Sequence, residues 1–136
     1  MRMSRQEIKD EYKQSEGDPH VKGKLRQLRA ERARQRMMQA VPDADVVITN
    51  PTHFSIALKY KPDEMPAPIV VAKGIDEIAL RIREVAKEHD VVLYENRPLA
   101  RALYDVVEID EMIPTEHFQA VAEIISYVFK LKGTIK

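Results

Sequence analysis

Hydrophobic and polar positions divide the chain into a sparsely apolar N-terminal stretch and a body of alternating short strands and helices. From Lys22 to Ala40 strong helix formers dominate, while apolar residues are few. This pattern predicts a solvent-exposed helix that packs only at its C-terminal end, where Pro42 closes it. In the body, four runs rich in β-branched and apolar residues predict strands, at 45–49, 54–60, 69–72 and 90–94.

The predicted strands differ in their expected burial. Residues 45–49 and 69–72 are largely apolar, which predicts strands buried on both faces, whereas the alternation over 54–60 predicts a strand with one exposed face. An apolar stripe at helical spacing, from Ile75 to Ala86, predicts an amphipathic helix over 76–89.

Turn and capping residues complete the set of predicted elements. Three prolines within 61–68 predict a loop, which is either a connector or a docking segment. Asn96 is placed to cap a short helix that carries Pro98 in its first turn. Pro114 and the threonine after it open a last helix, which reaches toward the end of the chain.

The order of these elements predicts the topology of the sheet. Strand 69–72, helix 76–89 and strand 90–94 form one βαβ unit, so we expect the two strands to pair in parallel. Strands 45–49 and 54–60 are joined by only a few residues, which predicts antiparallel pairing. The expected fold is α/β: a mixed four-stranded sheet flanked by helices and preceded by a long N-terminal linker helix. We expect a helical linker arm over 1–40 and a globular domain over 41–136.

Charge is distributed unevenly between these two parts. The 136 residues carry no net charge, but 1–40 hold 11 Lys and Arg against 6 Asp and Glu, and 41–136 hold 11 against 16. A basic arm suits nucleic acid, an anionic membrane surface or the acidic body itself. Because the arm lacks interleaved aromatic residues and any nucleic-acid recognition motif, a solvated linker helix is the favoured interpretation.

The composition also restricts the available chemistry. There is no cysteine, which excludes disulfides, a cysteine nucleophile and thiolate metal ligands. No apolar run approaches the roughly 20 residues that span a bilayer. His20, His89 and His117 have no partners at metal-ligand spacing, so we expect no metal and no cofactor. We also find no group of residues suited to the turnover of a substrate.

The most informative stretch is Asn50-Pro51-Thr52-His53, between the first two predicted strands. Pro51 has no N–H, so it cannot attack the Asn50 side chain, which is the usual route of asparagine degradation. The Asn50 side-chain nitrogen can instead attack the Asn50 main-chain carbonyl, forming a succinimide and releasing Pro51. Imidazoles exchange protons near neutral pH, so His53, or a water that it orients, can protonate the leaving nitrogen, and the Thr52 hydroxyl can hold the turn.

A fold can supply the acceleration that this reaction needs. A time constant of about three years in an unstructured chain corresponds to a barrier near ~28 kcal/mol, and completion within about ten minutes requires roughly 21 kcal/mol. Holding nucleophile and carbonyl together can supply ~7 kcal/mol or more. The reaction is a single intramolecular turnover. The alternative is that Asn50 and Pro51 simply form a hairpin turn, which is a common use of these residues.

Beyond these four residues, several segments resemble the FlhB/YscU family of export-switch proteins, and its flagellar branch in particular. The similar segments cover most of the chain from about residue 4 to 130, and they are Glu16 to Gly23, Ala44 to His53, Val70 to Gly74, Ala79 to Arg83 and Pro98 to Tyr104.

This resemblance implies a place and a role. The full protein would carry an N-terminal transmembrane part, so Met1 would begin an excised fragment at the cytoplasmic face of the bacterial inner membrane. It would cleave itself between Asn50 and Pro51, with both pieces remaining associated, and so switch export from rod and hook proteins to filament proteins. Implied partners are other export-gate membrane proteins, a hook-length-control protein, export substrates and their chaperones. Within this interpretation, residues 22–40 suit an anionic membrane surface.

Two alternatives remain open from the sequence. One is a protein-docking platform of the export apparatus whose turn is never cleaved. The other, which we rank last, is a nucleic-acid-binding domain led by the basic arm.

Overall fold

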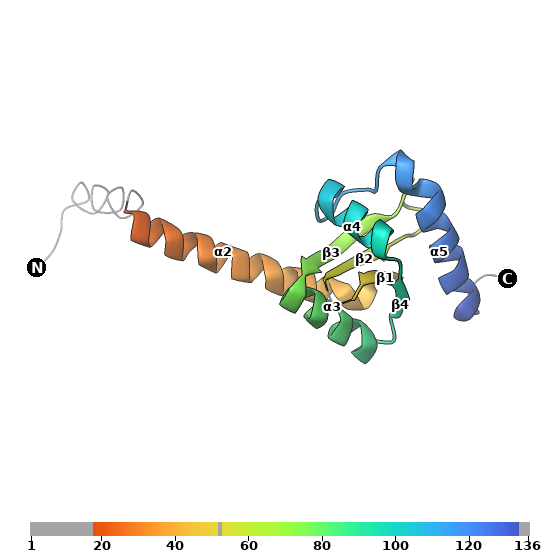
Figure 1. Cartoon of the computed structure of the whole chain (residues 1–136), viewed down its shortest axis with the longest axis horizontal. Helices are drawn as coiled ribbons and strands as arrows, with labels where there is room; N and C mark the ends of the chain where they lie inside the picture. The colour runs from red at the N-terminus through yellow and green to blue at the C-terminus, as the bar shows by residue number, and fades with distance from the viewer. Residues whose placement is uncertain (1–17, 52, 134–136) are drawn as a thin grey trace, which may run out of the picture. The chain divides into compact units, whose positions relative to one another are not determined.

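The computed structural model describes residues 18–51 and 53–133, within two compact units that divide between Arg36 and Met37 (Figure 1). The elements are α2 (Pro19–Ala40), η1 (Val41–Asp43), β1 (Val46–Asn50), β2 (Phe54–Lys59), β3 (Ile69–Ile75), α3 (Asp76–Glu88), β4 (Val92–Glu95), α4 (Arg97–Val106), η2 (Thr115–His117) and α5 (Phe118–Leu131).

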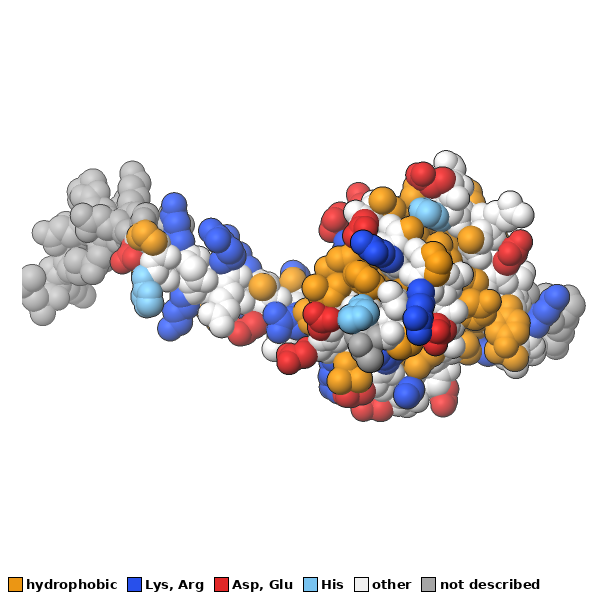
Figure 2. All heavy atoms as spheres, viewed as in Figure 1, with side chains coloured by type: hydrophobic (Ala, Val, Ile, Leu, Met, Phe, Trp, Pro, Cys, Tyr) orange, Lys and Arg blue, Asp and Glu red, His pale blue; other side chains and the backbone are white. Residues whose placement is uncertain are grey.

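Helix α2 is exposed along most of its length, as its sparse apolar positions predict. It begins at Pro19, a residue suited to the first helical turn, and Leu25 and Leu28 both remain exposed. Met37 is its one buried residue and lies in its last turn. Figure 2 shows Lys and Arg side chains along this helix. Among the helices of the described residues, none combines the length and apolar character needed to cross a bilayer.

The sheet has four strands in the order β3-β2-β1-β4. β1 pairs with β2 antiparallel and with β4 parallel, and β2 pairs with β3 antiparallel. The predicted mixed sheet and the antiparallel hairpin are therefore confirmed. The predicted pairing of the third strand with the fourth is wrong, because the β1–β2 hairpin lies between them. Helix α3 connects the two edge strands and contacts β3, β2 and β4.

Helices cover both faces of the sheet, and this decides which strands are buried (Figure 1). α4 and α5 pack on the face that carries Ile56 and Leu58, while α3, η1 and the end of α2 pack on the face that carries Ala57. β2 is therefore buried from Ser55 to Leu58, and the prediction of one exposed face is wrong. β3 was expected to be fully buried, but it alternates between buried and half-buried residues because it lies at the edge of the sheet.

The amphipathic helix predicted over 76–89 is confirmed as α3. Its buried residues are Ala79, Ile82, Val85 and Ala86. Ile75, which the apolar stripe placed on the same face, instead ends β3 and is exposed.

Candidate functional site

The turn that joins β1 to β2 carries the predicted chemistry. Asn50 is the last residue of β1 and lies opposite Phe54, the first residue of β2. The His53 N–H donates a hydrogen bond to the main-chain carbonyl oxygen of Asn50, with N and O 2.7 Å apart. This carbonyl is the predicted electrophile, so the bond draws electron density from the carbon that Asn50 would attack. Thr52 lies outside the described residues.

Buried contacts anchor the chain on both sides of the turn. On the β1 side, the Thr49 carbonyl oxygen accepts a hydrogen bond of 3.0 Å from the Asn96 N–H, directly before α4. On the β2 side, the Ser55 hydroxyl donates a bond of 2.9 Å to the Ala79 carbonyl oxygen in α3. Thr49 and Ser55 are the two buried polar residues of the described chain. The strands that enter and leave the turn are thus tied to different helices.

His53 is exposed and faces Asp76, the first residue of α3. Its Nδ1 lies 3.6 Å from the Asp76 carboxylate, and the Asp76 N–H donates a bond of 2.9 Å to the His53 carbonyl oxygen. This partner could not be predicted from the sequence, because 22 residues lie between the two positions and no local pattern links them. Asn50, Pro51 and His53 lie together because they are neighbours in the chain.

Helix α4 begins as its sequence predicts. The Asn96 side-chain oxygen accepts a hydrogen bond of 3.1 Å from the Leu99 N–H, and Pro98 lies in the first turn. Leu99 and Leu103 are buried against the sheet. Asn96 therefore caps α4 through its side chain and holds the Thr49 carbonyl oxygen through its N–H.

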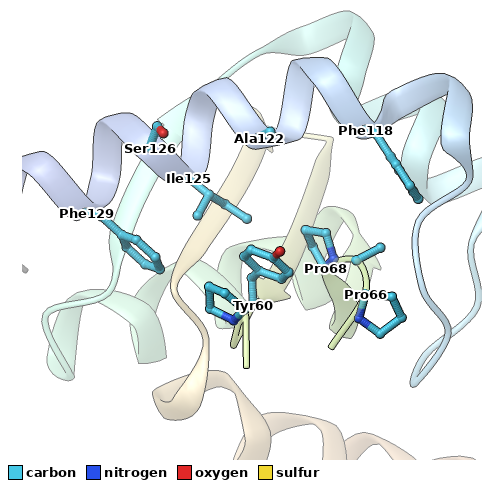
Figure 3. A pocket seen from close by; sticks show the side chains of 10 residues that line it. Tyr60, Pro66, Pro68, Phe118, Ala122, Ile125, Ser126 and Phe129 are labelled. Carbon is cyan, nitrogen blue, oxygen red and sulfur yellow. The ribbon is translucent and has the colours of Figure 1, made fainter. Parts of the chain in front are cut away.

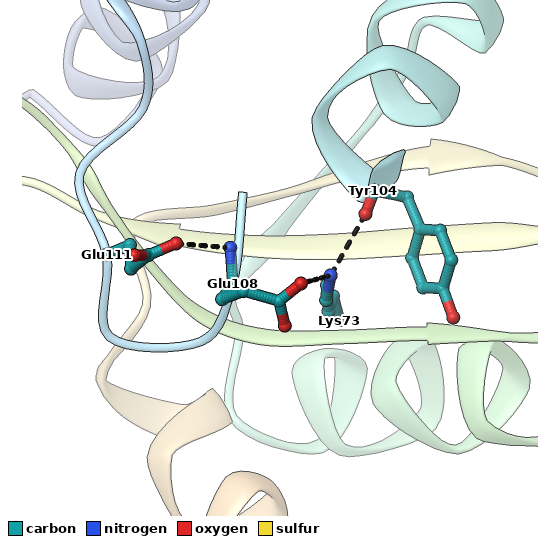
Figure 4. Close-up of polar contacts among 4 residues, drawn as sticks. All are labelled: Lys73, Tyr104, Glu108 and Glu111. Carbon is teal, nitrogen blue, oxygen red and sulfur yellow. Dashed lines mark hydrogen bonds and ion pairs between the residues drawn. The ribbon is translucent and has the colours of Figure 1, made fainter. Parts of the chain in front are cut away.

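A lysine on β3 joins the C-terminal end of α4 to the sheet. Lys73 Nζ donates a bond of 2.9 Å to the Tyr104 carbonyl oxygen, pairs with Glu108 at 3.5 Å and lies 4.7 Å from the centre of the Tyr104 ring (Figure 4). That ring packs on Phe54, with centroids 5.3 Å apart. Since Phe54 directly follows His53, this cluster supports the exit from the turn. The sequence signal that could have revealed this cluster is a single lysine within an otherwise apolar strand.

A hydrophobic pocket of about 310 Å³ lies between α5 and the proline-containing loop, away from the turn (Figure 3). Its lining residues are Tyr60, Pro62, Pro66, Ala67, Pro68, Phe118, Ala122, Ile125, Ser126 and Phe129. Three prolines make one wall of the pocket rigid. Binding of an apolar chain segment would therefore cost this wall little conformational entropy. It is a second candidate site.

The remaining histidines are distributed over the surface. His89 caps the C-terminal end of α3, with its Nδ1 3.0 Å from the Val85 carbonyl oxygen, as expected for the polar end of a helix. Within 18–51 and 53–133, no three His, Cys, Asp or Glu side chains are grouped as metal ligands.

Comparison with known proteins identifies relatives over nearly the whole chain. The model of the FlhB HrpN YscU SpaS family matches residues 1–128. The flagellar biosynthetic protein FlhB of Bacillus subtilis (strain 168) is 62% identical over 135 residues, which make up 99% of this chain and 38% of that protein. Its counterpart in Salmonella typhimurium is 58% identical over 132 residues, which are 97% of this chain and 34% of that protein.

Similarity extends to solved structures. The crystal structure of the cytoplasmic domain of FlhB from Shewanella putrefaciens aligns with a TM-score of 0.69 and 43% identity, covering 74% of this chain and 81% of that one. The chain spans only about a third of the length of the two curated relatives.

Proposed function

The chain belongs to the FlhB HrpN YscU SpaS family of flagellar and type III export proteins, and from this premise we propose that it cleaves itself between Asn50 and Pro51. The cleavage then switches export from rod and hook proteins to filament proteins. Asn50 supplies the nucleophile and the carbonyl, Pro51 is the leaving group, His53 transfers the proton and Thr52 supports the turn.

The hydrogen bond from the His53 N–H to the Asn50 carbonyl oxygen carries the proposal. When the Asn50 side-chain nitrogen adds to the carbonyl carbon, negative charge develops on this oxygen, beside a donor that is already in place. One such donor contributes about 3 kcal/mol to transition-state stability. That is close to half of the ~7 kcal/mol that folding must supply, and positioning within the anchored hairpin supplies the remainder.

The two products would remain bound to each other. After cleavage, β1 still lies between β2 and β4, where Val46, Val47 and Ile48 are fully buried. Removing three such side chains from the core costs roughly 5–9 kcal/mol. The break would therefore free the turn while the sheet stays intact.

Intact-mass spectrometry of the purified protein tests the proposal. We expect fragments 1–50 and 51–136, whose masses sum to that of the parent until the succinimide takes up water. Asn50→Ala and the nearly isosteric Asn50→Asp should both yield one uncleaved chain, because neither retains the amide nitrogen. An immediate gain of one water would indicate hydrolysis, and a parent chain that stays whole at neutral pH would refute self-cleavage.

The setting and partners of this event are part of the proposal. We place the chain at the cytoplasmic face of the bacterial inner membrane, with 1–40 as a juxtamembrane arm and 41–136 as the cleaving domain. Lys and Arg of 22–40 would contact anionic lipid, at about 1 kcal/mol per residue. Proposed partners are other export-gate membrane proteins, a hook-length-control protein, export substrates and their chaperones.

Vesicle sedimentation tests the lipid contact. Binding to anionic vesicles should exceed binding to neutral vesicles and fall as salt is raised. Equal binding to both vesicle types would contradict it.

The pocket beside α5 favours a second candidate function, a docking platform for export partners that does not depend on cleavage. Ala122 is exposed and lines the pocket, so Ala122→Glu would place a charge there without disturbing the core. The platform predicts that Ala122→Glu weakens partner binding while Asn50→Ala leaves it unchanged. The opposite pattern would favour a switch that acts through the cleaved turn.

A further inference from the structure

Asp76 contacts His53 through both its main chain and its side chain. Its N–H donates a bond of 2.9 Å to the His53 carbonyl oxygen, and its carboxylate oxygen lies 3.6 Å from His53 Nδ1. The second distance is that of an ion pair and is slightly longer than a hydrogen bond. Two contacts between the same residues restrict both the position of the His53 backbone and the direction of its ring.

The backbone of Asp76 is unusual. Its φ is +48°, in the left-handed region that residues with a Cβ rarely adopt. Asp tolerates this region better than most residues, because its short polar side chain can bond locally. Strained conformations of this kind persist where surrounding contacts hold them, and they occur preferentially at functional sites.

The segment around Asp76 is held firmly in place. Gly74 allows β3 to approach α3 so closely that a Cβ there would lie 2.8 Å from the Ile78 Cβ. Three residues after Asp76, the Ala79 carbonyl oxygen accepts the buried hydrogen bond from Ser55. The start of α3 therefore cannot move away from the first residues of β2, and Asp76 stays opposite His53.

We propose that Asp76 is a positioning residue for cleavage at Asn50, an inference that rests on the proposed function. Its carboxylate, 3.6 Å from Nδ1, favours the tautomer of His53 that carries its proton on Nδ1, which leaves Nε2 unprotonated. Nε2 takes a proton from the Asn50 amide nitrogen as the new C–N bond forms. It returns that proton to the Pro51 nitrogen as the old C–N bond breaks. The imidazole ends in its starting state, and no proton is transferred to Asp76.

A purely structural role for the same side chain predicts different results. Asp76 lies in the first turn of α3, where a negative charge stabilises the helix dipole. If that were its only role, removing the charge would affect cleavage through the stability of α3, whether or not His53 is present. If Asp76 acts through His53, its effect disappears once the imidazole is removed.

The test is a double-mutant cycle on the cleavage rate. The rate is measured by pulse-labelled cell-free synthesis of the whole chain and gel separation of the fragments. Asp76→Asn should slow cleavage about two- to fivefold, the range expected for an exposed charge pair. In a His53→Ala background the same substitution should change nothing. Asp90→Asn is the matched control and should leave the rate unchanged. Asp90 is also an exposed aspartate with positive φ, at the other end of α3.

The outcomes distinguish a role of Asp76 in positioning His53 from a role in stabilising α3. Equal rates for Asp76→Asn and the parent would overturn the inference while leaving self-cleavage intact. Equal slowing in both backgrounds would also overturn it and assign Asp76 to the stability of α3. A parent chain that never cleaves would refute the proposed function, and the inference with it.

The tautomer of His53 gives an independent measurement that a purely structural role would not change. In the uncleavable Asn50→Ala protein labelled with ¹⁵N-histidine, the neutral ring should carry its proton on Nδ1. Adding Asp76→Asn should shift the population toward the Nε2–H form. An unchanged ratio of the two nitrogen signals would overturn the inference.

Discussion

Replacing Gly74 with alanine tests whether the close approach of β3 to α3 supports both the fold and the turn. The added methyl carbon would lie 2.8 Å from the Ile78 Cβ and 3.3 Å from its carbonyl carbon. Favourable carbon contacts lie at roughly 3.5–4.0 Å. Helix α3 would therefore have to move away from the strand by about 1 Å. Overpacking of this kind costs about 1–3 kcal/mol of folding free energy.

Urea unfolding measured in the uncleavable Asn50→Ala protein gives this cost. We expect Gly74→Ala to lower the transition midpoint while the slope with denaturant stays constant. In the cleavable chain the same substitution should slow cleavage, because movement of α3 draws the Asp76 N–H away from the His53 carbonyl oxygen.

Two further variants test whether the contact with Ile78 causes this loss of stability. Gly74→Ala should cost less in an Ile78→Ala background, because the Ile78 Cγ2, the atom nearest to the added methyl, is then absent. Gly23→Ala should have the opposite sign. Nothing lies within 4 Å of that position, so the alanine should stabilise helix α2 by up to about 1 kcal/mol, which circular dichroism would detect as increased helical content. If Gly74→Ala unfolds at the parent's midpoint, the close approach does not limit the fold.

Three other substitutions test the contacts around the turn. Lys73→Met removes the donor to the Tyr104 carbonyl and should lower the free energy of unfolding by about 1.5–3 kcal/mol in urea titrations; a loss under 0.5 kcal/mol would show that the contact is dispensable. Ser55→Ala should cost about 1 kcal/mol by the same titration, since it removes a buried hydroxyl whose acceptor is the Ala79 carbonyl. Ile48→Ala should cost about 2–5 kcal/mol and release fragment 1–50 from 51–136 in gel filtration, whereas continued co-elution would mean that β1 burial does not hold the pieces together.

The sequence by itself determined most of the elements and predicted the chemistry of the turn. Helix α3 follows from apolar residues spaced at one helical period, and the start of α4 follows from the side chain of Asn96 and the fixed φ of Pro98. The self-cleavage hypothesis also needs only neighbours in the chain, since the nucleophile and the carbonyl both belong to Asn50 and the bond that breaks joins it to Pro51. All of these depend on contacts within a few residues, which a linear pattern records.

Only the tertiary structure decided which strands are neighbours, which faces are covered and which partners reach the turn. A βαβ pattern specifies the direction of its two strands and leaves open whether others lie between them, as β1 and β2 do here. The alternation in β2 could not reveal that α3 covers its second face. The contacts of His53 with Asp76 and of Lys73 with Tyr104 join residues far apart in sequence. Such contacts arise from the packing of whole elements, which hydrophobic periodicity does not encode.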